Sequence, residues 1–326
     1  MADGPGGSRI VIYGALAANA GIAVAKFVAA ALTGSSSMLS EAIHSTVDST
    51  NELLLLWGEH RAQKPLDRSR PFGYGRELYF WSFVVAILIF GLGAGVSAYE
   101  GWTHIANPEE LTNPLVNYVV LGLAFLLEGA SWTIAMRRFR QAKGERGWWE
   151  AVRRSKDPST LVVVLEDSAA LLGITIAAAG IALSHALDEP RIDGVASILI
   201  GLVLALVAAV LAQKAKGLLI GEPADQAVID KVRAMLSAHP RVTAVNHVRT
   251  IHVAPEKVFV ALSVDFEDSM TMGEGEALVE ALEEDLRKEM PELASIYIRP
   301  EKEDMARLAA ARLSTPVGLE RAATTP

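Results

Sequence analysis

Six apolar runs occupy the first 220 residues of the chain. Each is close to the roughly 20 residues that a helix needs to cross about 30 Å of hydrocarbon. The runs are Ile10–Leu32, Met38–Gly58, Leu78–Ile105, Leu115–Met136, Leu161–Leu183 and Ile192–Leu211. Asn19 lies at the centre of the first run and no cleavage site follows it, so we interpret this run as a retained helix and not as a signal peptide. The pattern predicts an α-helical membrane protein with six transmembrane helices.

After Gly221 the periodicity is that of a small folded domain. A helical spacing ends at Pro240, and apolar residues then alternate with other residues over 245–253 and 258–266, the two-residue period of half-buried strands. Thr271 and Glu274 have the spacing of a capping box that opens a second helix, and a short strand at 295–299 follows. This order predicts a small α+β (α-β-β-α-β) domain, in which two helices cover a sheet.

These patterns divide the chain into four parts. An N-terminal tail covers 1–9, the six-helix transmembrane domain 10–220, the α+β domain 221–300 and a C-terminal tail 301–326, which we expect to be disordered or loosely helical. The loops after the second and fourth runs are rich in Lys and Arg, whereas the other loops are poor in them, so both termini are predicted to be cytoplasmic. Trp148 and Trp149, in the second basic loop, indicate either an amphipathic segment at the membrane interface or a solvated loop.

Composition narrows the possible chemistry. Hydrophobic residues make up 51% of the chain, and its mean hydropathy of +0.29 argues against a soluble protein. Most of the formal net charge of −8 arises after residue 220, where 19 acidic residues oppose 12 basic ones. A nucleic-acid partner is not expected, because phosphate binding needs a basic surplus. The chain contains no cysteine, so any metal ion must be held by histidine and carboxylate.

Ionisable residues inside the apolar runs mark the candidate site, because each costs roughly 2.5–3.5 kcal/mol to insert and is functional by default. His44 and Asp48 are four residues apart, which places them on one face of the second helix. Glu166 and Asp167 interrupt the fifth run; they diverge by about 100° on a helix, and Asp167 is the stronger ligand candidate. His44, Asp48 and Asp167 form a set suited to Zn²⁺ and usable by Mn²⁺, Fe²⁺ or Co²⁺. The pattern predicts a metal site in the core of the bundle.

Three further polar residues in the runs have two interpretations each. Glu166 is either a ligand or the partner in a helix–helix hydrogen bond, and Asn51 is either an accessory ligand or a member of an interhelical hydrogen bond. Glu128 either binds a proton or pairs with a neighbouring helix. Among small residues, Gly91 and Gly95 are four apart and are expected to let two helices pack closely.

Three segments together resemble the cation diffusion facilitator family of zinc and divalent-metal transporters. They are Ser37–Asp48 in the second run, Arg70–Glu77 at the start of the third and Glu166–Gly173 in the fifth. The six runs and the small C-terminal domain fit the same family, so the resemblance covers roughly 10–300. Within the family, the chain is similar to the branch of the mitochondrial and nuclear zinc-transporter relative and of many bacterial members.

The resemblance also implies ligands and a mechanism. In the family, the second and fifth spans each supply two ligands four residues apart, and the ion leaves the cytoplasm in exchange for protons. His44 and Asp48 match the first pair and Asp167 matches the acid of the second, but the position four residues before Asp167 is Val163. Glu166, Asn51 or water is expected to replace the missing ligand. The family further implies a homodimer that forms through the C-terminal domain.

We therefore expect a divalent metal cation exporter, a Zn²⁺/H⁺ antiporter in the inner (plasma) membrane of a bacterium, with Mn²⁺, Fe²⁺ or Co²⁺ as alternative cargo. Its partners are the metal ion, protons, the lipid bilayer and a second copy of the chain, and no organic cofactor is expected. His44, Asp48 and Glu128 are the candidates for proton coupling. The chain is not expected to be an enzyme; the rivals, a membrane metalloenzyme and a metal sensor, would bind metal without accumulating it in vesicles.

Overall fold

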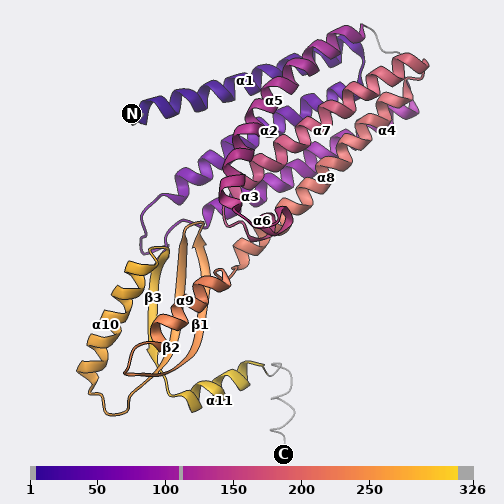
Figure 1. The fold of residues 1–326 in the computed structure, drawn as a ribbon. Helices are drawn as coiled ribbons and strands as arrows, with labels where there is room; N and C mark the ends of the chain where they lie inside the picture. Colours follow the sequence, from indigo (N-terminus) through magenta and orange to yellow (C-terminus); the bar gives the residue numbers. More distant parts are fainter. Residues whose placement is uncertain (1–4, 110–112, 315–326) are drawn as a thin grey trace, which may run out of the picture. The chain divides into compact units, whose positions relative to one another are not determined.

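The computed structural model contains two compact units, which divide between Leu219 and Ile220, one residue before the predicted boundary. It describes residues 5–109 and 113–314, and at 5–15, 17, 18 and 309–314 it describes the backbone alone. The first unit is a bundle of long helices, and the second is a sheet with helices packed on it (Figure 1).

The first unit consists of long helices joined by turns and loops. They are α1 (Pro5–Thr33), α2 (Ser36–Ala62), α3 (Glu77–Leu88), η1 (Ile89–Ala94), α4 (Gly95–Ala106), α5 (Pro114–Lys143), α6 (Trp148–Arg154), α7 (Pro158–Leu187) and α8 (Arg191–Ile220). The predicted N-terminal tail is helical from Pro5, and residues 1–4 lie outside the described part. The segment with Trp148 and Trp149 is the short helix α6, in which Trp148 stacks on Phe139 with 6.1 Å between ring centroids. This segment is therefore ordered against the bundle.

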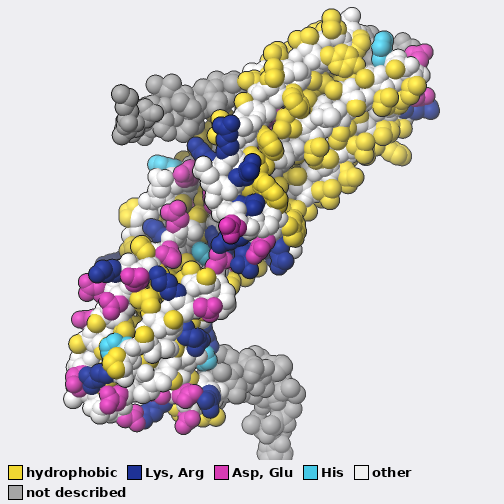
Figure 2. Space-filling model, viewed as in Figure 1, with side chains coloured by type: hydrophobic (Ala, Val, Ile, Leu, Met, Phe, Trp, Pro, Cys, Tyr) yellow, Lys and Arg dark blue, Asp and Glu magenta, His cyan; other side chains and the backbone are white. Residues whose placement is uncertain are grey.

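Four of the described helical segments are long and apolar enough to cross a membrane. They are Glu77–Ala106, Pro114–Lys143, Pro158–Leu187 and Arg191–Ile220, and Asn19–Thr33 is a shorter apolar helix. Helix α2 is long enough, but Glu41, Asp48 and Glu52 make it more polar. Hydrophobic side chains cover much of the visible surface of the bundle (Figure 2). The unit is thus a helical domain of the membrane type, and the count of six spans stays a prediction.

Helices α4 and α8 cross where each has a glycine. A Cβ atom on Gly101 would lie 2.5 Å from the carbonyl oxygen of Gly194, and a Cβ on Gly194 would lie 2.8 Å from that of Gly101. Gly91 and Gly95, which were predicted to serve this purpose, are both exposed, and nothing lies within 4 Å of a Cβ at Gly91. They lie in and beside the π-helical turn η1, whose wider turn leaves them on the outside of the bundle. The prediction that Gly91 and Gly95 let two helices of the same chain pack closely is therefore wrong.

Replacing Gly101 with valine is expected to destabilise the bundle by about 1–3 kcal/mol or more, because the added side chain overpacks the crossing. The matched control is Gly91→Val, whose side chain meets open space. Thermal unfolding of the detergent-solubilised chain, followed by circular dichroism, measures both variants. Equal losses of stability in the two would contradict the close crossing of α4 and α8.

Asp193, in the first turn of α8, is hydrogen-bonded to the turn between α1 and α2. Its fully buried carboxylate accepts hydrogen bonds from Ser35 Oγ at 3.1 Å, from the backbone nitrogen of Ser37 at 3.2 Å and from the Ser37 hydroxyl. The carboxylate lies at the N-terminus of α2, where free N–H groups favour a negative charge. Gly34 supplies the positive φ of 71° in the turn. Three helices are therefore held together at this end of the bundle.

The second unit has the predicted order of elements, followed by one further helix. It contains α9 (Gln226–Ser237), β1 (Val242–Ala254), β2 (Lys257–Phe266), α10 (Met272–Glu289), β3 (Leu293–Pro300) and α11 (Glu303–Ser314). The central strand β2 is antiparallel to β1 and parallel to β3. Thr271 and Glu274 form the predicted capping box of α10. Leu236 of α9 and Leu286 of α10 share one buried core with Val260 of β2, so these two helices cover one face of the sheet.

Helix α11 occupies part of the predicted C-terminal tail. The chain before it is fastened to the sheet, because Ser263 Oγ donates to Glu301 Oε2 at 2.6 Å and Asn246 donates to the Glu301 carbonyl at 2.8 Å. The backbone nitrogen of Glu303 then donates to Asp265 at 3.0 Å, which caps the start of the helix. These contacts join polar groups, so the pattern of hydrophobic residues does not predict them. Of the two alternatives given for this tail, the structure contains a helix over 303–314, and 315–326 lie outside the described residues.

Candidate metal centre

Helix α2 carries a stripe of polar side chains into the interior of the bundle. His44 is 1% exposed, and its Nδ1 lies 3.3 Å from Oδ1 of Asp48, one turn further along. Within the described residues, neither ring nitrogen of His44 nor Oδ1 of Asp48 has a hydrogen-bond partner. Such atoms are rare, because a buried polar group left unpaired costs about 1–3 kcal/mol. A bound cation would satisfy the imidazole and the carboxylate together.

A cavity of about 300 Å³ opens beside this stripe, and we call it the site cavity. Carboxylates from three helices line it, namely Asp48 of α2, Glu128 of α5 and Asp167 of α7. The lining continues to Glu59 and Arg138, so the cavity extends about 16 Å along α2 from Asp48 to the end that carries the basic loops. We call that end of the bundle the basic face. The candidate ligands are therefore approached from the basic face.

The two acids of the fifth run have different surroundings. Asp167 accepts a hydrogen bond from Ser131 Oγ of α5 at 2.8 Å. Glu166 is buried and accepts a hydrogen bond of 2.6 Å from the side-chain amide of Asn51 on α2. Of the two interpretations given for Glu166 and Asn51, the structure contains the interhelical hydrogen bond. The bond uses the amide nitrogen of Asn51, and Asn51 Oδ1 is buried without a hydrogen-bond partner among the described residues, so the bond is compatible with a ligand role.

Val163 lines the site cavity one turn before Asp167. Its side chain offers no donor atom, so the position that carries a ligand in the resembled family is apolar at the cavity wall. Glu128 lines the same cavity from α5, which suits the interpretation that it binds a proton, because solvent in the cavity would reach its carboxylate. The wall of the site cavity therefore offers no donor atom at position 163.

The candidate ligands are not yet gathered into a finished coordination shell. Among the residues that the structure describes, no three His, Asp or Glu side chains are close enough together to hold a metal ion. His44 and Asp48 are in contact on α2, whereas Asp167 faces the cavity from α7, which packs against α2. A complete shell therefore needs ligands from both α2 and α7.

A buried ion pair that the sequence prediction missed lies next to the candidate ligands. Lys26 of α1 and Glu41 of α2 are both fully buried, and Lys26 Nζ donates to Glu41 Oε2 at 2.9 Å and to Ser45 Oγ at 2.7 Å. Glu41 fits against α7 because residue 173 is glycine, and a Cβ on Gly173 would collide with Oε1 of Glu41. A signal for this pair was present in the sequence, since a lysine within an apolar run is as costly as an aspartate.

The Lys26–Glu41 pair lies between the site cavity and a second cavity at the opposite end of the bundle. This second cavity, of about 590 Å³, is called the vestibule below. Along α1, Lys26 lies between Asn19 of the site cavity and Ala30 of the vestibule. Along α2, Glu41 lies between Leu39 of the vestibule and the part of α2 that lines the site cavity. The pair is therefore part of a barrier between two cavities that lead to opposite ends of the same helices.

Two family models match the chain one after the other. The model of the cation efflux transmembrane domain matches residues 12–220, and the model of the cation efflux protein cytoplasmic domain matches residues 224–303. The chain belongs to the cation efflux family. This confirms the resemblance to the cation diffusion facilitators, and all the candidate ligands of this cation efflux protein lie within the first matched region.

Several known proteins are similar to most of the chain. The mitochondrial proton-coupled zinc antiporter SLC30A9 of Mus musculus is 35% identical over 245 residues, which are 74% of this chain and 43% of that protein. Metal tolerance protein C4 of Arabidopsis thaliana is 29% identical over 72% of this chain and 52% of that protein. Magnetosome protein MamM of Paramagnetospirillum magneticum is 22% identical over 90% of this chain and 88% of that protein. The chain spans less than half the length of the SLC30A9 proteins that it matches.

These relatives contradict one prediction. We expected this cation efflux protein to lie in the inner (plasma) membrane of a bacterium, but the SLC30A9 relatives from mouse, human and orangutan (Pongo abelii) are named as mitochondrial. The basic loops indicate which side of a membrane they occupy, and they carry no information on which membrane it is. The prediction of a bacterial inner membrane is therefore wrong.

Proposed function

We propose that the chain is a divalent metal efflux transporter that exchanges Zn²⁺ for protons. The observation that carries the proposal is the site cavity, in which Asp48, Glu128 and Asp167 from three helices face a space that extends to the basic face. Zn²⁺ binds imidazole nitrogen and carboxylate oxygen, and His44 and Asp48 hold such atoms unpaired. The family, and the zinc antiporter name of the SLC30A9 relatives, support the same cargo.

The arrangement suggests how transport proceeds. Zn²⁺ enters from the basic face and is bound by deprotonated His44, Asp48 and Asp167, with Glu166, Asn51 or water at the open position. A rearrangement of the helices then breaks the barrier beside these ligands and connects them to the vestibule. Protons compete with the metal for the same nitrogen and oxygen atoms, so protonation releases the ion and the return step carries protons back. Such alternation around a fixed site is the general mode of secondary transporters.

Two architectural features belong to the same proposal. Helices α1 and α2 complete a set of six spans with the four apolar segments, because the charges on α2 face the interior of the bundle and not lipid. The second unit pairs two copies of the chain, a role supported by its match to the family model named ZT_dimer. Glu128 carries protons together with His44 and Asp48, since it faces the same cavity.

Metal flux into proteoliposomes tests this function. With a zinc-sensitive dye trapped inside, an imposed pH gradient is expected to drive accumulation of Zn²⁺, and reversing the gradient should reverse the net flux. Saturable Zn²⁺ binding without accumulation would overturn transport in favour of a sensor or an enzyme. Accumulation that ignores the pH gradient would overturn the proton exchange. The same assay with Mn²⁺, Fe²⁺ and Co²⁺ ranks the alternative cargoes.

Replacing Val163 with aspartate is expected to tighten Zn²⁺ binding about tenfold, which corresponds to about 1.4 kcal/mol. The new carboxylate would lie one turn before Asp167 on the wall of the site cavity and would fill the open ligand position. Titration calorimetry of the purified chain measures the affinity. Val163→Asn is the matched control, because it has nearly the same size and no charge. An affinity of Val163→Asp equal to that of the parent chain would show that a carboxylate at position 163 does not contribute a ligand.

A further inference from the structure

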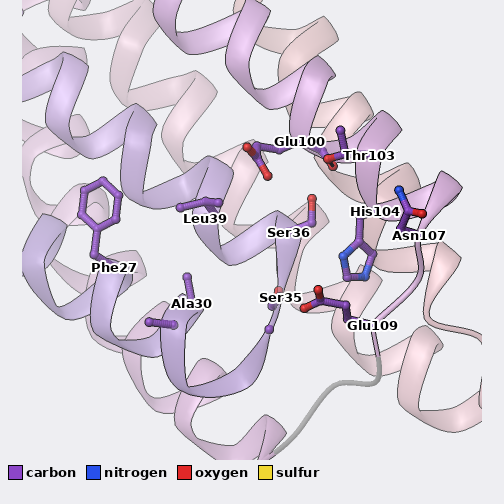
Figure 3. A pocket seen from close by; sticks show the side chains of 12 residues that line it. Phe27, Ala30, Ser35, Ser36, Leu39, Glu100, Thr103, His104, Asn107 and Glu109 are labelled. Atoms are coloured by element: carbon purple, nitrogen blue, oxygen red, sulfur yellow. Dashed lines mark hydrogen bonds between the residues drawn. The ribbon is translucent and has the colours of Figure 1, made fainter.

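The vestibule gathers acidic and imidazole side chains without a basic partner. Figure 3 shows its wall, to which α4, the loop that follows α4 and the turn between α1 and α2 contribute. The polar members of the wall are Ser35, Ser36, Glu100, Thr103, His104, Asn107 and Glu109. No Lys or Arg is among the described residues that line it. Glu100 is half-buried in this wall. The vestibule is therefore suited to a cation.

His104 is the member of the wall that points to a ligand. Its side chain is 8% exposed, and its buried Nε2 has no hydrogen-bond partner within the described residues. Glu100 lies one turn earlier on α4, so the carboxylate and the imidazole share a helix face. His44 and Asp48 have the same spacing on α2, in the opposite order. The buried hydroxyl of Ser36 on the facing wall also has no partner among the described residues.

We propose that the vestibule holds a second, weaker site for a divalent cation, bound by Glu100 and His104 and completed by Glu109 from the loop after α4. Figure 3 shows the side chains of His104 and Glu109 in the same wall of the vestibule. The three side chains are not yet gathered around one point, and Glu109 is exposed, so the site binds weakly. Weak binding suits transit, because an ion on a conduction path must leave each site as readily as it enters. The place of this site on the path rests on the proposed transport function, whereas the binding itself does not.

One feature of the vestibule opposes a cation, and the structure offsets it. The N-terminus of α2 reaches this cavity, and its partial positive charge repels metal ions. The buried carboxylate of Asp193 accepts hydrogen bonds from Ser35 and Ser37 at that terminus, which places a full negative charge against the partial positive one. The electrostatic potential in the vestibule is therefore determined mainly by the acidic residues of its wall, Glu100 and Glu109.

Titration of the full-length chain with ZnCl₂ tests the second site. The starting variant carries His44→Ala and Asp48→Ala, so that the first site is removed, and a weak binding step is expected to remain. Adding His104→Ala or Glu100→Gln should lower the affinity of that step at least tenfold. His185→Ala is the matched control, because His185 lies in the last turn of α7 and does not line the vestibule. No weak step, an unchanged step with His104→Ala, or an equal loss with His185→Ala would overturn the proposal.

A second variant guards against misfolding as the cause of lost binding. His104→Asn keeps a polar side chain of smaller size, and it should lose the weak step while its melting temperature stays near that of the parent. The titration uses Zn²⁺ alone and no pH gradient. A chain that binds in the vestibule but accumulates no zinc in vesicles contradicts the transport function and not the site. A chain that transports zinc without the weak step contradicts the site and not the transport function.

Discussion

Replacing Asp48 with asparagine is expected to reduce zinc transport by more than about 100-fold, because loss of a direct ligand costs more than the 10- to 100-fold that loss of a supporting residue costs. Asp48 carries one of the unpaired oxygens beside His44 and faces the site cavity. Asparagine has the same shape, but it carries no negative charge and keeps only one oxygen, so it is a much weaker ligand for Zn²⁺ than a carboxylate. Initial rates of Zn²⁺ uptake by proteoliposomes, driven by a fixed pH gradient, measure the change.

The same substitution, Asp48→Asn, should not lower the stability of the chain. Oδ1 of Asp48 has no hydrogen-bond partner among the described residues and only a 3.3 Å contact with Nδ1 of His44, so the substitution removes a poorly compensated charge and breaks no hydrogen bond to that oxygen. The melting temperature of Asp48→Asn is expected to equal or exceed that of the parent chain, the usual relation at a site selected for function. Asp188→Asn is the matched control, because Asp188 is exposed in a left-handed conformation that asparagine also adopts. Asp48→Asn with transport equal to that of the control would contradict the assignment of Asp48 as a ligand.

Replacing Lys26 with methionine is expected to destabilise the bundle by about 3–5 kcal/mol, the usual cost of breaking a buried ion pair from one side. Methionine fills similar space but leaves Glu41 fully buried without its cation. The hydrogen bond from Lys26 to Ser45 is lost as well. Thermal unfolding of the detergent-solubilised chain should therefore begin well below that of the parent.

A double substitution separates the ion pair from simple loss of packing. Lys26→Met combined with Glu41→Gln removes both charges, and it should recover most of the stability that Lys26→Met alone loses. Lys216→Met is the matched control, since Lys216 is exposed on α8 and its loss should cost little. If Lys26→Met costs no more than Lys216→Met, or if the double variant is no more stable than the single one, the ion pair is not a structural element of the barrier.

Helix α2 shows how much of the site can be predicted from the sequence. His44 and Asp48 are conspicuous because polar residues four apart interrupt an apolar run, and the structure places them in contact. The partners of Asp167 and Glu166 are not predictable in this way. Ser131 and Asn51 lie on other helices, and hydropathy does not specify which faces of two helices meet. The sequence thus indicates the polar members of a bundle core and leaves their pairing open.

In the fold, too, some elements follow from the hydrophobic pattern of the sequence, whereas others depend on contacts between residues far apart in the sequence. The strands and helices of the second unit follow from the period of their apolar residues, and the capping box of α10 follows from Thr271 and Glu274. The fastening of α11 depends on Asn246, Ser263 and Glu301, which are polar and far apart in the sequence. Lys26 is a different case, because a lysine within an apolar run was a visible signal that called for a partner.

The π-helical turn η1 has a consequence for how this chain tolerates insertions and deletions. A turn with one residue more than an α-helical turn changes the direction of every later side chain by about 100° relative to an uninterrupted helix. Gly101 and His104 both follow η1, so the crossing with α8 and the wall of the vestibule depend on that extra residue. Deleting one residue within 89–94 would leave a helix still long enough to cross a bilayer, yet it would aim both positions away from their neighbours. The length of this segment is therefore fixed more tightly than the thickness of a membrane requires.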